Sequence, residues 1–152
     1  MSEFEKMLGC TCFKLRKATR AMSRLYDHHL GLHGLKTTQY SLLVNVSRKA
    51  MPIAELAERI GADRTTMTRN LKPLIDAGWV ELKAGADSRQ RIATVTASGL
   101  EKIQAAAHGW RTAQAELEQL LGRDAVRALH VQLDDTTRQL TPLLEKLHVP
   151  SE

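Results

Sequence analysis

Apolar residues recur every three or four positions through most of this chain, and that spacing is the feature that most restricts its fold. From Phe4 to Leu30 they are interleaved with basic residues, and from Val126 to Leu147 leucines keep nearly the same spacing. Nine Gly, four Pro and six aromatic residues leave little material for a β-sandwich or β-barrel. The pattern therefore predicts a mainly α fold.

Glycines and capping residues divide the middle of the chain into shorter elements. Thr37 or Thr38 is expected to cap one helix, and Asp63 is expected to cap another. Pro52 is expected in a first helical turn, and Thr96 and Asp124 are expected to cap the last two helices. In chain order, we expect helices over 4–30, 37–49, 52–60 and 64–77, strands over 79–83 and 91–96, and helices over 97–121 and 124–147. This order predicts a helix-turn-helix followed by a two-stranded hairpin.

The second helix of the predicted helix-turn-helix has an outward face that suits DNA. Hydroxyl groups near its start fit phosphate oxygens and base edges, and an Arg fork fits guanine O6 and N7. The hairpin adds two guanidinium groups that suit a narrow minor groove, with Asp87 expected to hold Arg89 in position. The expected DNA contacts are Thr37, Thr38, Pro52, Arg64, Thr65, Thr66, Thr68, Arg69, Lys72, Asp87, Ser88, Arg89 and Arg91. An ordinary solvated helix face is the alternative.

Several motifs in this order resemble the multiple antibiotic resistance regulator (MarR) family. They are Pro52–Ala57, Arg64–Arg69, Gly78-Trp79-Val80 and Asp87-Ser88-Arg89, followed by Val95-Thr96-Ala97-Ser98-Gly99. The resemblance covers nearly the whole chain. It implies a winged helix-turn-helix homodimer that binds double-stranded DNA at a pseudo-palindromic operator, usually as a repressor released by a small ligand or by oxidation.

The same resemblance implies that different segments of the chain serve dimerisation and DNA binding. Residues 1–36 and 116–152 are assigned to a helical dimerisation region, interleaved across the dimer axis. Residues 37–115 are assigned to the DNA-binding lobe with the start of a long connecting helix, and both parts belong to a single integrated domain. Apolar seams at the two ends of the chain independently favour pairing with a second copy.

The resemblance also implies a crevice for a phenolic or aromatic carboxylate effector. Five residues are candidates to line it: Arg16, Tyr26, His33, Tyr40 and Trp110. Aromatic faces stack on a ligand ring, and a guanidinium binds a carboxylate. Because Tyr40 and Trp110 lie at apolar helical positions, a core role stays open for both.

The two cysteines leave a redox alternative open. Cys12-Phe13 followed by Tyr26 is similar to the redox site of the organic hydroperoxide resistance branch of the family, in which a thiol senses peroxide. That branch has a second tyrosine where Arg16 stands here, and packing of a helix is the other interpretation. No metal or other cofactor is expected, because the one-residue gap between Cys10 and Cys12 directs their sulfurs about 200° apart on a helix.

Sequence signals for catalysis and for membrane insertion are missing. No Gly-rich phosphate loop, Gly-x-Ser-x-Gly or His-Glu-x-x-His motif occurs, so an enzyme is not expected. No apolar stretch approaches the roughly 18–20 residues of a membrane span, so we expect a cytoplasmic protein without a membrane partner. A helical dimer or adaptor that does not bind DNA is the alternative of a different class, but it gives no reason for the Arg-bearing hairpin.

Overall fold

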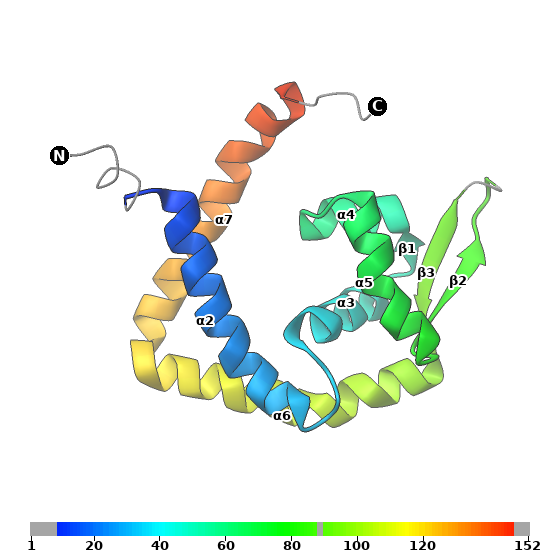
Figure 1. Ribbon diagram of the computed structural model, residues 1–152, viewed down its shortest axis with the longest axis horizontal. Coiled ribbons are helices and arrows are strands. Elements are labelled where there is room, and N and C mark those ends of the chain that lie inside the picture. The colour runs from blue at the N-terminus through cyan, green and yellow to red at the C-terminus, as the bar shows by residue number, and fades with distance from the viewer. Residues whose placement is uncertain (1–8, 88–89, 148–152) are drawn as a thin grey trace. The chain divides into compact units, whose positions relative to one another are not determined.

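The structure is a computed structural model that describes residues 9–87 and 90–147 (Figure 1). Within these residues it contains six helices and three strands. The helices are α2 (Thr11–Gly31), α3 (Thr37–Arg48), α4 (Ile53–Ile60), α5 (Arg64–Asp76), α6 (Ala97–Leu121) and α7 (Arg123–Lys146), and the strands are β1 (Met51–Pro52), β2 (Val80–Ala84) and β3 (Arg91–Val95). The mainly α winged helix-turn-helix prediction is confirmed.

The chain divides into two compact units, residues 1–113 and residues 114–152, with the boundary inside α6. The first unit contains α2 to α5, the sheet and most of α6. The second contains the end of α6 and all of α7. The predicted assignment of residues 1–36 and 116–152 to a dimerisation region concerns a second copy of the chain and stays a prediction. Among the described residues, no helix is long and apolar enough to cross a membrane.

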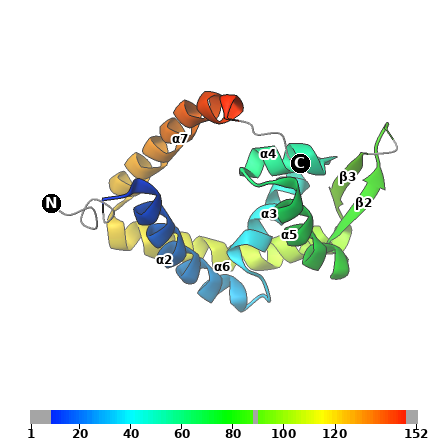
Figure 2. The same ribbon diagram turned by 45° about the horizontal axis from the view of Figure 1, so that its top comes forward.

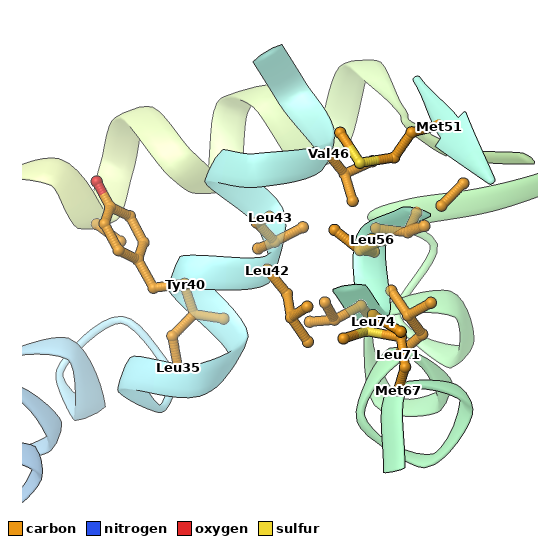
Figure 3. Close-up of a cluster of buried hydrophobic side chains, with 14 of the residues drawn as sticks. Leu35, Tyr40, Leu42, Leu43, Val46, Met51, Leu56, Met67, Leu71 and Leu74 are labelled. Carbon is orange, nitrogen blue, oxygen red and sulfur yellow. The ribbon is translucent and has the colours of Figure 1, made fainter. Parts of the chain in front are cut away.

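The core of the first unit forms where α3, α4 and α5 meet (Figure 3). Met67, Leu71 and Leu74 recur at helical spacing on α5 and are all fully buried. They face Leu43 of α3 and Leu56 of α4, which are equally buried. Full burial of each such side chain stabilises the fold by about 1.5–3 kcal/mol. Their spacing therefore determines which face of α5 turns outward.

The small sheet places the hairpin beside the helix-turn-helix. Its strand order is β1-β3-β2, and both pairings are antiparallel. Strands β2 and β3 form the predicted hairpin, which begins at the C-terminal end of α5 and runs back to one side of that helix in both views (Figure 2). Strand β1 was not predicted, because two residues carry no periodic signal. It pairs Pro52 with Ile92, so Pro52 ends a strand and caps α4 and does not lie in the first turn of that helix as predicted.

The helix caps are partly as predicted. Asp63 accepts the Thr66 N–H at 2.7 Å, and Thr96 accepts the Gly99 N–H at 3.0 Å through its hydroxyl oxygen, so these two caps are confirmed. The prediction that Thr37 or Thr38 caps α3 is wrong, because Lys36 holds that position and its N–H donates to Gln39 Oε1 at 2.9 Å. Gly122, and not Asp124, precedes α7. Its φ of 88° is readily adopted only by glycine.

The buried face of α5 can be tested by truncation. Leu71→Ala removes a fully buried side chain and leaves a cavity, so we expect the free energy of unfolding to fall by about 2–5 kcal/mol. Leu32→Ala is the matched control, because Leu32 is 81% exposed and its truncation is expected to change stability by less than about 0.5 kcal/mol. Urea unfolding followed by circular dichroism measures both. Equal losses in the two variants would contradict the assignment of the core.

Candidate nucleic-acid interface and ligand pocket

Helix α5 carries six of the thirteen residues that the sequence predicted as DNA contacts. Five of them are exposed because the opposite face is occupied by the core, and Thr66 is half-buried. One shallow groove is lined by Arg64, Thr65, Thr68, Arg69, Lys72, Ile75 and Asp76. Cationic forks, hydroxyl groups and aliphatic stems on one helical face match what phosphates and base edges of DNA require.

The start of α5 is held by a compact set of hydrogen bonds. The Asp63 carboxylate accepts the Thr66 N–H at 2.7 Å and the Thr66 hydroxyl at 2.6 Å. These two bonds, the hydroxyl bond first, lower the pKa of Asp63. Thr66 was predicted as a DNA contact, but its hydroxyl proton is already donated to the cap. The Thr68 hydroxyl donates to the Arg64 carbonyl at 3.0 Å and keeps lone pairs for an outside donor.

An acidic residue whose pairing with Lys72 was not predicted lies at the far end of this face. Lys72 Nζ contacts the two carboxylate oxygens of Asp76 at 2.8 and 3.1 Å. Both side chains are largely exposed, so this pair stabilises the helix by less than about 1 kcal/mol. The spacing of four residues was the available signal. A phosphate at this end of the groove would have to compete with Asp76 for the Lys72 ammonium.

A second cationic depression joins the helix-turn-helix to the hairpin. Pro52, Arg64 and Arg91, which the sequence predicted separately, line one pocket of about 240 Å³ with Ile53, Ala54 and Gln90. Pairing of β1 with β3 causes this convergence, because it sets Pro52 opposite the residue that follows Arg91. Gln90 was not predicted, since nothing in the linear order shows that strand pairing brings it to the start of α4.

The tip of the hairpin is described only in part. The Gln90 N–H donates to the Asp87 carbonyl at 2.9 Å, and the Gly85 N–H donates to the Gln90 carbonyl at 3.0 Å. These bonds close the turn between β2 and β3. The predicted contacts Ser88 and Arg89 lie outside the described residues, so the expected pairing of Asp87 with Arg89 stays a prediction.

The two threonines at the start of α3 differ in their surroundings. Thr38 is exposed, as a backbone contact to DNA requires. The Thr37 N–H and hydroxyl both donate to Asp27 Oδ1 at 2.7 Å, which ties the start of α3 to α2. Thr37 therefore has its donors engaged within the protein, and it lines a different pocket.

That pocket brings together three of the five candidate effector residues. Tyr26, Tyr40 and Trp110 line a cavity of about 410 Å³ with Thr37, Ser41, Val44 and Asn45. The approach of α6 to α2 beside it depends on Gly109, where a Cβ atom would lie 2.9 Å from the His29 carbonyl oxygen. Arg16 and His33 do not line the cavity. Arg16 is exposed and lies ten residues before Tyr26, about 15 Å along α2.

Tyr40 lies between this pocket and the core. Its side chain is only 9% exposed, and Figure 3 shows it pointing away from the Met67, Leu71 and Leu74 cluster. Burial raises the pKa of Tyr40, and the nearby positive charge of Arg111 partly opposes that rise. The phenol therefore stays neutral at physiological pH and presents a donor and an acceptor. The core and effector interpretations of this residue are thus compatible.

The two cysteines are accessible to solvent, but the described residues form no metal site around them. Cys10 precedes α2, Cys12 lies in its first turn, and both are exposed. Tyr26 of the same chain lies fourteen residues after Cys12, about 21 Å along the helix, so the two residues do not meet within one chain. In the part of the chain that the structure describes, no group of three or more His, Cys, Asp or Glu residues is arranged to hold a metal ion. Thiol sensing through Cys12 stays a prediction.

Comparison with known proteins identifies the family. The transcriptional regulator MosR of M. tuberculosis, solved in complex with DNA, is 38% identical, with a TM-score of 0.75 over 86% of this chain and 97% of that chain. Residues 33–90 also match the MarR family model. The chain belongs to the MarR family. Family membership makes it a transcriptional regulator and not an enzyme, as the missing catalytic motifs indicated.

More distant relatives agree with this assignment. A mutant of MarR from E. coli, solved with operator DNA, has a TM-score of 0.78 at 21% identity over 90% of this chain and 99% of that chain, and it shares the fold. The HTH-type transcriptional regulator YwoH of Bacillus subtilis is 25% identical over 93 residues, which are 60% of this chain and 67% of that protein. The MarR resemblance drawn from the motifs is therefore confirmed.

The Asp63 cap should give the stability of this MarR-family chain a specific pH dependence. A folded-state pKa below the unfolded value of about 3.9 means that the ionised cap stabilises the fold above that pH. This contribution is lost as the pH falls through the folded-state pKa. We therefore expect the difference in melting temperature between the wild type and Asp63→Ala to be largest near neutral pH and to shrink below about pH 4.

Thermal unfolding between pH 7 and pH 3 measures this difference. Asp63→Asn is the matched control, because an amide oxygen retains a cap acceptor but carries no charge. A constant difference between the wild type and Asp63→Ala across this pH range would contradict the assignment.

Proposed function

We propose that this MarR-family protein is a homodimeric repressor that binds a pseudo-palindromic operator and is released by a small aromatic ligand. The observation that carries DNA binding is the convergence of Arg64, Arg69, Lys72 and Arg91 on the exposed side of the first unit. MosR, which is 38% identical over nearly its whole length, was solved bound to DNA. Surface cations that serve only solubility need not lie on one face, whereas cations that bind a nucleic acid must lie together on the face that contacts it.

The two cationic sites suit different parts of the duplex. On the outer face of α5, Arg69 has the hydroxyl group of Thr68 beside it and the exposed Thr65 on the same face, a set that suits base edges in the major groove. Arg64 and Arg91 meet beside the start of α4, which suits a backbone phosphate. The hairpin then extends toward the neighbouring minor groove. In this arrangement Arg69 recognises the base sequence, and the site formed by Arg64 and Arg91 fixes the position of the protein along the duplex.

Dimerisation is supported by the exposed apolar surface of the second unit. Helix α7 has 24 residues, and Val126 is its one buried hydrophobic residue among those described. Leu140, Leu143, Leu144 and Leu147 are between 46% and 61% exposed. Such a row in a single chain marks an interaction surface, and its length suits another long helix. A second copy would bring a second α5, about 34 Å away for successive major grooves.

Ligand response is supported by the pocket between α2, α3 and α6. Its aromatic lining suits a planar ring, and its volume falls within the usual range of small-molecule sites. Thr37 lines it and is also bound to Asp27 of α2. A ligand that shifts α3 relative to α2 would change the placement of the helix-turn-helix that packs on α3. We propose that this shift lowers the affinity for the operator.

The DNA-reading role of Arg69 is tested by titration. For Arg69→Ala we expect specific binding to weaken by about 1–3 kcal/mol, with a much smaller loss on a random duplex. Fluorescence anisotropy measures both affinities, with the region upstream of its own reading frame, or a site selected from random sequence, as the specific DNA.

Arg127→Ala is the control, because Arg127 is a 79% exposed residue of α7 outside this face. Wild-type affinity should also fall with salt, with a log-log slope of roughly −0.9 per phosphate neutralised. A flat salt response would rule out the proposed function.

The dimer interface is tested by charge insertion. We expect the double variant Leu143→Asp/Leu147→Asp to dissociate the dimer, because two carboxylates would have to be desolvated at an apolar contact. Analytical ultracentrifugation measures the mass, and circular dichroism checks helix content. Leu100→Asp serves as the control, because Leu100 is a 44% exposed leucine outside the two predicted dimerisation segments. A dimer that persists in the double variant would contradict the role of α7.

A further inference from the structure

The pocket between α2, α3 and α6 has polar groups in its lining but no charged side chain. Its ring surfaces come from Tyr26, Tyr40 and Trp110. Besides the two tyrosine hydroxyls, its polar groups are the hydroxyls of Thr37 and Ser41 and the amide of Asn45, which donates one N–H to the Ser41 carbonyl at 2.9 Å. Among the residues that the structure describes, no Lys, Arg, His, Asp or Glu side chain lines the cavity.

One charge of each sign lies beside this cavity. Asp27 Oδ1 is 2.7 Å from the hydroxyl of the lining residue Thr37, so a carboxylate lies directly behind one wall. The positive charge of Arg111 also acts on the phenol of the lining residue Tyr40 and partly opposes the rise in its pKa. The carboxylate repels an anionic ligand and attracts a cationic one, and the guanidinium does the reverse, so a charged ligand of either sign meets one favourable and one unfavourable charge. Arg16, the guanidinium that the sequence predicted for a ligand carboxylate, is absent from the lining.

We propose that the pocket selects an uncharged aromatic molecule with a hydrogen-bonding edge, and that it discriminates against aromatic carboxylates. This inference rests on the proposed ligand response and names the chemical class of its ligand. A carboxylate entering the cavity would lose water without gaining an ion pair, which is costly. A neutral amide or phenol loses less hydration and pairs with Ser41 and Asn45. The repulsion from Asp27 adds to the discrimination.

A matched set of ligands tests this selectivity. The probes are 4-hydroxybenzamide, 4-hydroxybenzoate and 4-hydroxybenzylamine, which share a ring and a phenol and differ in charge at pH 7. Isothermal titration calorimetry of the full chain without DNA measures each affinity. We expect the amide to bind at least about tenfold tighter than either charged probe. A tighter carboxylate, a tighter amine, equal binding of all three or no binding of the amide would overturn the proposal.

Three variants locate the effect. Trp110→Ala should abolish binding of the amide, whereas Phe13→Ala, which truncates a similarly exposed aromatic residue outside the pocket, should leave it unchanged. Asp27→Asn keeps an acceptor for Thr37 but removes the charge, so the preference for amide over carboxylate should fall by about threefold or more. An unchanged preference in Asp27→Asn, with the helix content intact, would overturn the role of Asp27.

The calorimetry is independent of operator binding. If the ligands fail to bind while the anisotropy titration shows salt-dependent DNA binding, the inference falls and the DNA-binding part of the proposed function stands. If DNA binding fails while the amide binds selectively, the inference about the pocket stands and the DNA-binding role falls.

Discussion

Burial of one face of α5 against α3 and α4 is the constraint on which the rest of the first unit depends. Met67, Leu71 and Leu74 have no exposed surface, so α5 cannot rotate about its axis without exposing them to water. The outward direction of Arg69 and Lys72 follows from this packing and not from any contact of their own. The Asp63 cap then determines where the helix begins and therefore where Arg64 and Thr65 lie.

Helix α3 connects this core to the ligand pocket. It buries Leu42, Leu43 and Val46 in the core and presents Ser41, Val44 and Asn45 to the cavity. Because these two sets of residues lie on different faces of one helix, a rotation or shift of α3 would move the core residues and the cavity residues together. The Asp27 contact at its first residue anchors the helix to α2. Helix α3 thus joins the proposed ligand pocket to the core on which α5, with its proposed DNA-reading face, is packed, and this is a physical route for coupling the two.

Local signals explain which features were predictable. The caps at Asp63 and Thr96 follow from side chains that bind N–H groups three residues ahead in the chain. The cap at Lys36 was missed because its backbone N–H is bound by a glutamine at the third helical position, with no capping side chain of the usual kind. Strand β1 was missed because two residues have no period, and its existence depends entirely on β3.

The sequence by itself determined the helices, the hairpin and the outward face of α5, because helical periodicity and caps act over a few neighbouring residues. It also determined the family, whose motifs are contiguous. Only the tertiary structure decided that Pro52, Arg64 and Arg91 share one depression, and that Tyr26, Tyr40 and Trp110 share a cavity without Arg16. These groupings depend on strand pairing and on the close approach of helices at Gly109, which join residues far apart in the chain.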